Sequence, residues 1–131
     1  MLFERRKYLN ELIAGRGNGL VKIVTGVRRC GKSFLLFNIW HNWLLEHGVD
    51  DGHIIEIQLD DYRNRKMRKP DALLGYIDSR VKDVGCPYYI VLDEVQLVED
   101  FVEVILSLTH MRNVDVYVSG SNSRFLSSDV V

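Results

Sequence analysis

Cysteine is scarce in this sequence, and long apolar runs are absent from it. With only Cys30 and Cys86 in the chain, a structural disulfide is not expected. No apolar run approaches the roughly 20 residues that a membrane-spanning helix needs. The charged start of the chain, residues 1–7, is not followed by an apolar stretch of signal-peptide length. The sequence therefore predicts a cytoplasmic protein that has no membrane partner.

A charge excess of either sign is also lacking. The 17 basic and 18 acidic residues give a net charge of −1, so composition points to no nucleic-acid partner and no acidic membrane surface. Internal repeats and low-complexity segments do not occur. The 131 residues, 47% of them apolar, are enough for one domain with a hydrophobic core.

One stretch stands out from this ordinary background. Residues 26–33, Gly-Val-Arg-Arg-Cys-Gly-Lys-Ser, fit the phosphate-binding loop pattern at every fixed position. An apolar, β-branched run at residues 20–25 precedes the stretch, and a helical pattern at residues 34–40 follows it. Strand, glycine-rich turn and helix in this order are the context in which such a loop binds phosphate.

The residue types of this loop suit a polyphosphate. Gly26 and Gly31 let the backbone turn its N–H groups inward, and the helix that follows adds the positive end of its dipole. Lys32 is expected to reach the β- and γ-phosphates, and the Ser33 hydroxyl is expected to bind Mg²⁺. The expected ATP-binding residues here are Gly26, Val27, Arg28, Arg29, Cys30, Gly31, Lys32, Ser33 and Phe34.

Hydrophobic periodicity divides the rest of the chain into alternating helices and strands. We expect helices at residues 4–14, 34–46, 71–84 and 99–111, and strands at residues 20–25, 53–59, 88–92 and 114–118. Alternation of this kind predicts a parallel α/β sheet. The run at 88–92 is apolar throughout, as in a central strand, whereas Glu56 and Gln58 indicate an edge strand. Asp71 is the expected N-cap of its helix.

Five of the seven residues at 63–69 are basic. Such a segment is either a nucleic-acid contact or a mobile, solvated loop. We favour the loop, because Pro70 follows and no aromatic residue is interleaved among the basic ones.

Polar residues follow two further strands. Asp93 comes directly after the apolar strand and is expected to hold Mg²⁺ beside Ser33, while Glu94 can activate a water for attack on the γ-phosphate. Ser119, Ser121 and Asn122 are alternatives for a hydrogen bond to that phosphate or water. Since ligands of parallel sheets bind at the carboxyl ends of the strands, these groups should meet on one rim.

The three motifs together resemble the AAA+ type of P-loop ATPase. Residues 26–33, the Asp-Glu-Val-Gln stretch at 93–96 and the Gly-Ser-Asn-Ser-Arg stretch at 120–124 are most similar to predicted bacterial and archaeal ATPases with an Arg-Arg pair in the loop. The resemblance covers about residues 4–128. It implies a three-layer P-loop fold with strand order 1-4-3-2, an ATP and Mg²⁺ site, and the roles given above for Lys32, Asp93 and Glu94.

Members of that family usually continue well beyond the last motif, so the resemblance implies that this chain, residues 1–131, is a fragment that lacks the fifth strand of the sheet. We then expect the strand at 20–25 to have an exposed edge through which the chain can self-associate.

Alternative functions stay open at the level of sequence. ATP hydrolysis coupled to conformational change is favoured, because Glu94 suits water activation. A small-molecule phosphotransferase would need an arginine-rich lid, which is not visible in the sequence. A GTPase would need an Asn-Lys-x-Asp motif, which is missing. A nucleotide-responsive interaction module without turnover is the non-enzymatic alternative.

Overall fold

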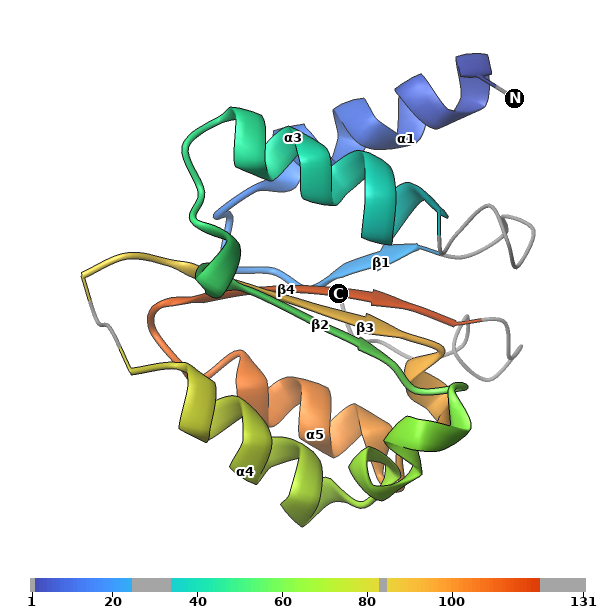
Figure 1. Ribbon diagram of the computed structural model, residues 1–131, viewed down its shortest axis with the longest axis vertical. Helices are drawn as coiled ribbons and strands as arrows, with labels where there is room; N and C mark the ends of the chain where they lie inside the picture. Colours follow the sequence, from blue (N-terminus) through green and yellow to red (C-terminus); the bar gives the residue numbers. More distant parts are fainter. Residues whose placement is uncertain (1, 25–33, 83–84, 121–131) are drawn as a thin grey trace.

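A sheet of four parallel strands, in the order β1-β4-β3-β2, forms the middle layer of the computed structural model, which describes residues 2–24, 34–82 and 85–120. Its strands are Lys22–Val24 (β1), Ile54–Gln58 (β2), Tyr88–Asp93 (β3) and Val114–Ser119 (β4). On one face lie α1 (Leu2–Gly15), η1 (Leu35–Trp40) and α3 (His41–Glu46), and on the other lie α4 (Pro70–Arg80) and α5 (Phe101–Leu108) (Figure 1). The predicted fold class and strand order are confirmed.

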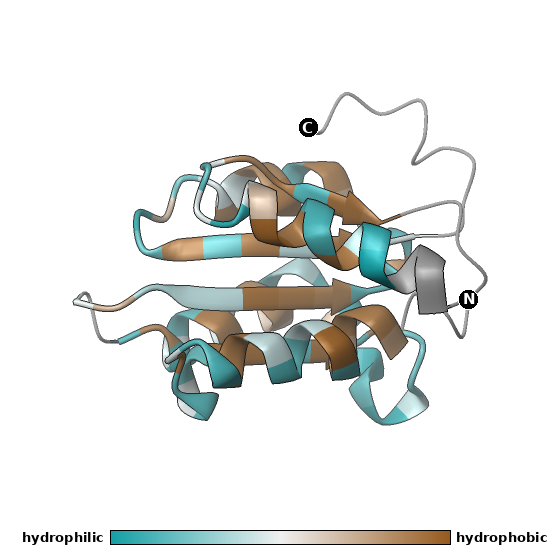
Figure 2. Ribbon diagram, turned by 90° about the horizontal axis from the view of Figure 1, so that it is seen from above, coloured by the Kyte–Doolittle hydropathy of each residue, from teal (hydrophilic) through white to brown (hydrophobic). Residues whose placement is uncertain are grey.

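The apolar run of β3 is explained by the two layers of helices. Side chains alternate along a strand, so Ile90 and Leu92 pack into the core under α4 and α5, while Tyr89 and Val91 pack into the core under α1 and α3. All six residues of β3 are buried. Figure 2 shows brown, apolar segments along the strands in the middle of the molecule, between helices that carry teal, hydrophilic residues. The interpretation of β3 as a central strand is confirmed.

β2 is an edge strand, as its two polar residues predicted. It pairs with β3 alone among the described parts of the chain, and Glu56 and Gln58 are its two partly exposed residues. Glu56 accepts a hydrogen bond from His41 of α3, with 2.8 Å between Oε2 and Nδ1. Partial burial raises the pKa of the Glu56 carboxyl above its ordinary value, and the contact with His41 opposes this rise.

Several predicted boundaries shift for local reasons. Asp71 is not the N-cap of α4, because Lys69 takes that position and Pro70, which has no N–H group, starts the helix. The helix ends at Arg80, since Val81 has left helical geometry. α5 begins at Phe101 because the preceding residue, Asp100, has a left-handed backbone with φ of 52°.

The predicted helix over residues 34–46 has two parts. η1 is a π-helix, and α3 continues it. Leu35 and Trp40 of this π-helix are buried in the core on this face of the sheet. This helix packs beside α1 on the same face.

β1 is shorter than the strand predicted at residues 20–25. Val21 is buried but outside the ladder, and Leu20 is 52% exposed. Within the described residues β1 pairs with β4 alone, so its other edge has no strand beside it there. Self-association through this edge stays a prediction.

In the described ranges, three short 3-10 helices join the larger elements. They are η2 (Asp51–His53), η3 (Tyr62–Arg68) and η4 (Val95–Leu97). η3 covers the basic segment that we interpreted as a mobile loop. That interpretation is wrong in its geometry, because the segment forms helical turns that merge at a kink at Asn64.

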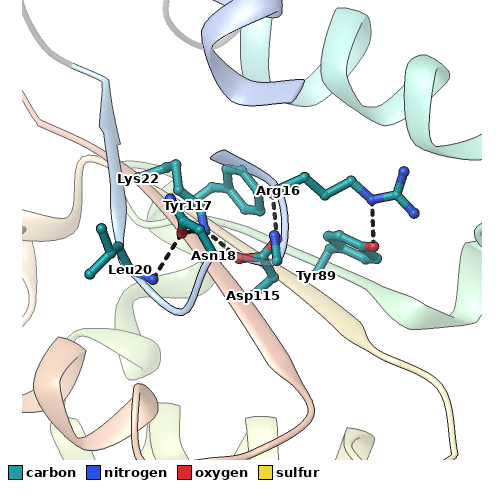
Figure 3. A network of polar contacts seen from close by, with 8 residues as sticks. Arg16, Asn18, Leu20, Lys22, Tyr89, Asp115 and Tyr117 are labelled. Atoms are coloured by element: carbon teal, nitrogen blue, oxygen red, sulfur yellow. Dashed lines mark hydrogen bonds and ion pairs between the residues drawn. The ribbon is translucent and has the colours of Figure 1, made fainter. Parts of the chain in front are cut away.

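A buried carboxylate fixes the turn between α1 and β1 at the amino-terminal end of the sheet. Asp115 of β4 forms an ion pair with Lys22 of β1, and their side chains are only 6% and 10% exposed. The Asp115 carboxylate also accepts hydrogen bonds from the backbone N–H of Gly17, at 2.9 Å, and from the Tyr117 hydroxyl, at 2.6 Å (Figure 3). Burial raises the pKa of the Tyr117 phenol, and the bond to Asp115 adds to this rise.

Candidate functional site

Three strand ends lie side by side on the rim of the sheet. Asp93 ends β3 and Ser119 ends β4, and the register that pairs Leu92 with Val118 makes these two end residues neighbours. Val24 ends β1 directly opposite Ser119. The predicted convergence is therefore observed for Asp93, for Ser119 and for the end of the strand that precedes the predicted phosphate-binding loop.

All eight residues of that loop, 26–33, lie outside the described part of the chain, and so do Ser121 and Asn122. The roles of Gly26, Val27, Arg28, Arg29, Cys30, Gly31, Lys32 and Ser33 therefore stay predictions. Their flanks are described: β1 ends at Val24, and Phe34 already has helical backbone angles, with φ of −63° and ψ of −42°. A strand before the loop and a helix after it are therefore present, although the strand is shorter than predicted and the helix begins as a π-helix.

The Ser119 hydroxyl joins the acidic pair. It donates a hydrogen bond to Oδ1 of Asp93 and accepts one from the backbone N–H of Glu94, at 3.0 Å. Ser119 is fully buried, and Asp93 is 1% exposed. Because a serine hydroxyl carries one proton, Ser119 cannot also donate to a phosphate oxygen while it donates to Asp93. In this arrangement Ser119 orders the carboxylate and the turn that follows β3.

Glu94 has an unusual backbone for its residue type. Its φ of 57° and ψ of 51° place it in the left-handed region, which costs roughly 1–2 kcal/mol for a residue with a Cβ. The residue is 2% exposed. A strained, buried carboxylate directly after a central strand is typical of functional sites rather than of solvated turns.

Gln96 is a site residue for which the sequence suggested no role. Its side-chain N–H donates to Oε1 of Glu94 at 2.8 Å, and its own buried Oε1 has no hydrogen-bond partner among the residues that the structure describes. The contact depends on the left-handed turn at Glu94 and on η4, which begins at Val95. Spacing in the sequence alone could not reveal it, because the contact needs the left-handed backbone of Glu94, which residues with a Cβ rarely adopt.

A comparison with protein families shows the family of this chain. A family model described as an AAA domain matches residues 18–131. The chain belongs to the AAA domain family. The match includes the segment that contains the predicted phosphate-binding loop and both polar clusters. Membership in the family supports a nucleotide-binding role of the ATPase type for this AAA domain.

Other comparisons add little about function. The AAA domain is 26% identical over 129 residues to a protein of Haemophilus influenzae that is itself described only as uncharacterized. The alignment covers 98% of this chain but 32% of that relative. No solved structure matches. In the described ranges, no helix has the length and apolar character that crossing a membrane requires.

Proposed function

We propose that this AAA domain binds ATP and hydrolyses it with Mg²⁺, and that hydrolysis drives a conformational change. The observation that carries the proposal is the Ser119 hydroxyl, which ties the Asp93 carboxylate to the turn at Glu94 on the rim where β1 leads into the loop. An ordered pair of buried acids, on the rim where β1 ends before the predicted glycine-rich loop, suits phosphate chemistry better than a structural role.

The loop and Asp93 would share the metal and the phosphates. Lys32 and the backbone of residues 26–33 would hold the phosphate chain, and Ser33 with Asp93 would hold Mg²⁺, in part through water. Hydroxyl and carboxylate oxygens are the ligands that this ion prefers, so the donor set fits the metal. The bound ion would neutralise the negative charge that develops on the phosphates.

Glu94 is the proposed general base. Its carboxylate would accept a proton from the attacking water, and the Gln96 amide would hold that carboxylate in place. This assignment favours hydrolysis over transfer to an acceptor, because a positioned carboxylate provides what a water nucleophile needs. Ser119 would act as a positioning residue for Asp93, and a contact to the γ-phosphate would come from Ser121 or Asn122.

Two substitutions and a matched control test the proposal. Titration with Mg·ATP followed by calorimetry should show binding to the wild type and a loss of binding in Lys32→Ala. Glu94→Gln should bind Mg·ATP but release phosphate about 100-fold more slowly, since general bases contribute roughly 10²–10⁴ in rate. Glu103→Gln, which removes an exposed acid on α5, should leave both properties unchanged.

The outcomes separate the alternatives. Equal binding by the wild type and Lys32→Ala would count against the nucleotide site. Binding without phosphate release by the wild type would favour an interaction module without turnover. Phosphate transfer to an added small-molecule acceptor would favour a phosphotransferase, and an unchanged rate in Glu94→Gln would remove Glu94 from its role.

A further inference from the structure

The basic segment at the end of β2 is not explained by the proposed ATP site. β2 is separated from β1, the strand before the phosphate-binding loop, by β3 and β4. Three steps between neighbouring strands put the ends of β2 and β1 about 14 Å apart, so η3 lies on the same rim, one strand from Asp93 of β3 but away from the end of β1 that leads into the predicted loop. The charge of η3 therefore needs a separate explanation.

η3 is fixed to the sheet by its own side chains. The Asn64 amide donates to the carbonyl oxygen of Gln58 at 2.9 Å, and Nε of Arg68 donates to the carbonyl oxygen of Leu59 at 2.8 Å. Asp61 accepts a hydrogen bond from the backbone N–H of Arg63 at the first turn. The segment thus presents its remaining side chains from a defined backbone.

The first residue of η3, Tyr62, is aromatic. Tyr62 is 70% exposed. The guanidinium carbon of Arg65 lies 4.2 Å from the centre of the ring, and Nη1 of Arg65 donates to the Tyr62 carbonyl at 3.1 Å. A basic segment with an exposed ring differs from the run without aromatics that we inferred from residues 63–69 alone.

The cations of η3 are only partly neutralised. Arg63 forms an ion pair with Asp61, and Lys69, just beyond the helix, forms one with Glu99. Arg65 and Lys66 are exposed, and neither has an ion pair with any residue that the structure describes. Two unneutralised cations and an exposed ring therefore share one short, anchored segment.

We propose that η3 binds single-stranded nucleic acid. Tyr62 stacks on an unpaired base, while Arg65 and Lys66 contact the phosphates on either side of it. Proteins that bind single strands combine stacking rings with a basic track, and the ring distinguishes this surface from one that attracts acidic proteins by charge alone. A duplex could not stack a base on Tyr62, because its bases are already stacked on one another.

Fluorescence anisotropy with a labelled oligothymidine of 20 nucleotides tests this inference without ATP. At low salt, Tyr62→Ala should weaken binding about tenfold or more, whereas Tyr62→Phe, which keeps the ring, should stay within about twofold. Lys66→Gln should lower the slope of log affinity against log salt by about 0.7, the value for one phosphate contact to a single strand. Lys7→Gln replaces an exposed lysine of α1 and is the matched control. It should change neither the affinity for the oligonucleotide nor the salt slope.

Each outcome decides the matter. Weaker binding by Tyr62→Ala with intact binding by Tyr62→Phe supports the inference, provided thermal unfolding shows both variants folded. No binding of the oligonucleotide by the wild type, or equal binding by Tyr62→Ala, overturns it. Binding of polyglutamate as tight as that of the oligonucleotide also overturns it, in favour of an acidic protein partner. Because no ATP is present, these results are independent of the proposed hydrolysis.

Discussion

Ser119 shows how one buried hydroxyl can organise a site. It is fully buried, it donates a hydrogen bond to Asp93, and its oxygen accepts one from the backbone N–H of Glu94. The turn that it supports contains the left-handed Glu94, whose backbone would relax without such contacts. At the scale of single residues, the positions of the Asp93 and Glu94 carboxylates depend on a few hydrogen bonds.

Ser119→Ala should therefore lower the free energy of unfolding by about 1–3 kcal/mol, because it removes the hydroxyl oxygen to which the buried N–H of Glu94 donates. Urea unfolding measures this loss. Ser107→Ala, at an exposed position of α5, is the control and should stay within about 0.5 kcal/mol of the wild type. A Ser119→Ala variant as stable as the Ser107→Ala control would show that the hydroxyl is not needed for the turn.

Between elements, the ion pair of Lys22 with Asp115 is a buried polar link. It joins β1 to β4 at the end of the sheet opposite the rim, and through Gly17 it also holds the turn after α1. A buried pair adds little net stability over apolar residues, but removal of one partner leaves the other charge buried.

Asp115→Ala should accordingly cost about 3–5 kcal/mol in the free energy of unfolding. The double variant Lys22→Met with Asp115→Ala should lose less than the sum of the two single losses, by about 0.5–3 kcal/mol, because no charge is left unpaired. A double-mutant cycle by urea unfolding measures the difference. Losses that simply add would mean that the two side chains act independently.

For the whole molecule, the sheet separates two hydrophobic cores. Ile77 of α4 packs in the core under α4 and α5, and Ile54 of β2 packs in the core under α1 and α3. β3 contributes alternate side chains to both cores, so neither half can lose its packing without loosening the strand that both share.

Ile54→Val and Ile77→Val should each lower the free energy of unfolding by about 0.5–1.5 kcal/mol. Their effects should add within about 0.5 kcal/mol, because the two residues are in different cores, and unfolding should stay a single transition. Circular dichroism and tryptophan fluorescence, followed together during urea unfolding, test this. Two separate transitions would show that the layers unfold independently.

The sequence alone determined the fold class, because periodicity separates helices from strands and the uninterrupted apolar run of β3 requires cover on both faces. The positions of Asp93 and Ser119 followed from the rule that ligands meet at the carboxyl ends of parallel strands. The tertiary structure decided the rest. Which atom Ser119 donates to depends on the pairing of β4 with β3, and the contact of Gln96 with Glu94 depends on a left-handed turn to which Ser119 of β4 is hydrogen-bonded. The exposure of Tyr62 depends on how η3 is held against the end of β2. No local pattern of residues encodes these contacts between segments.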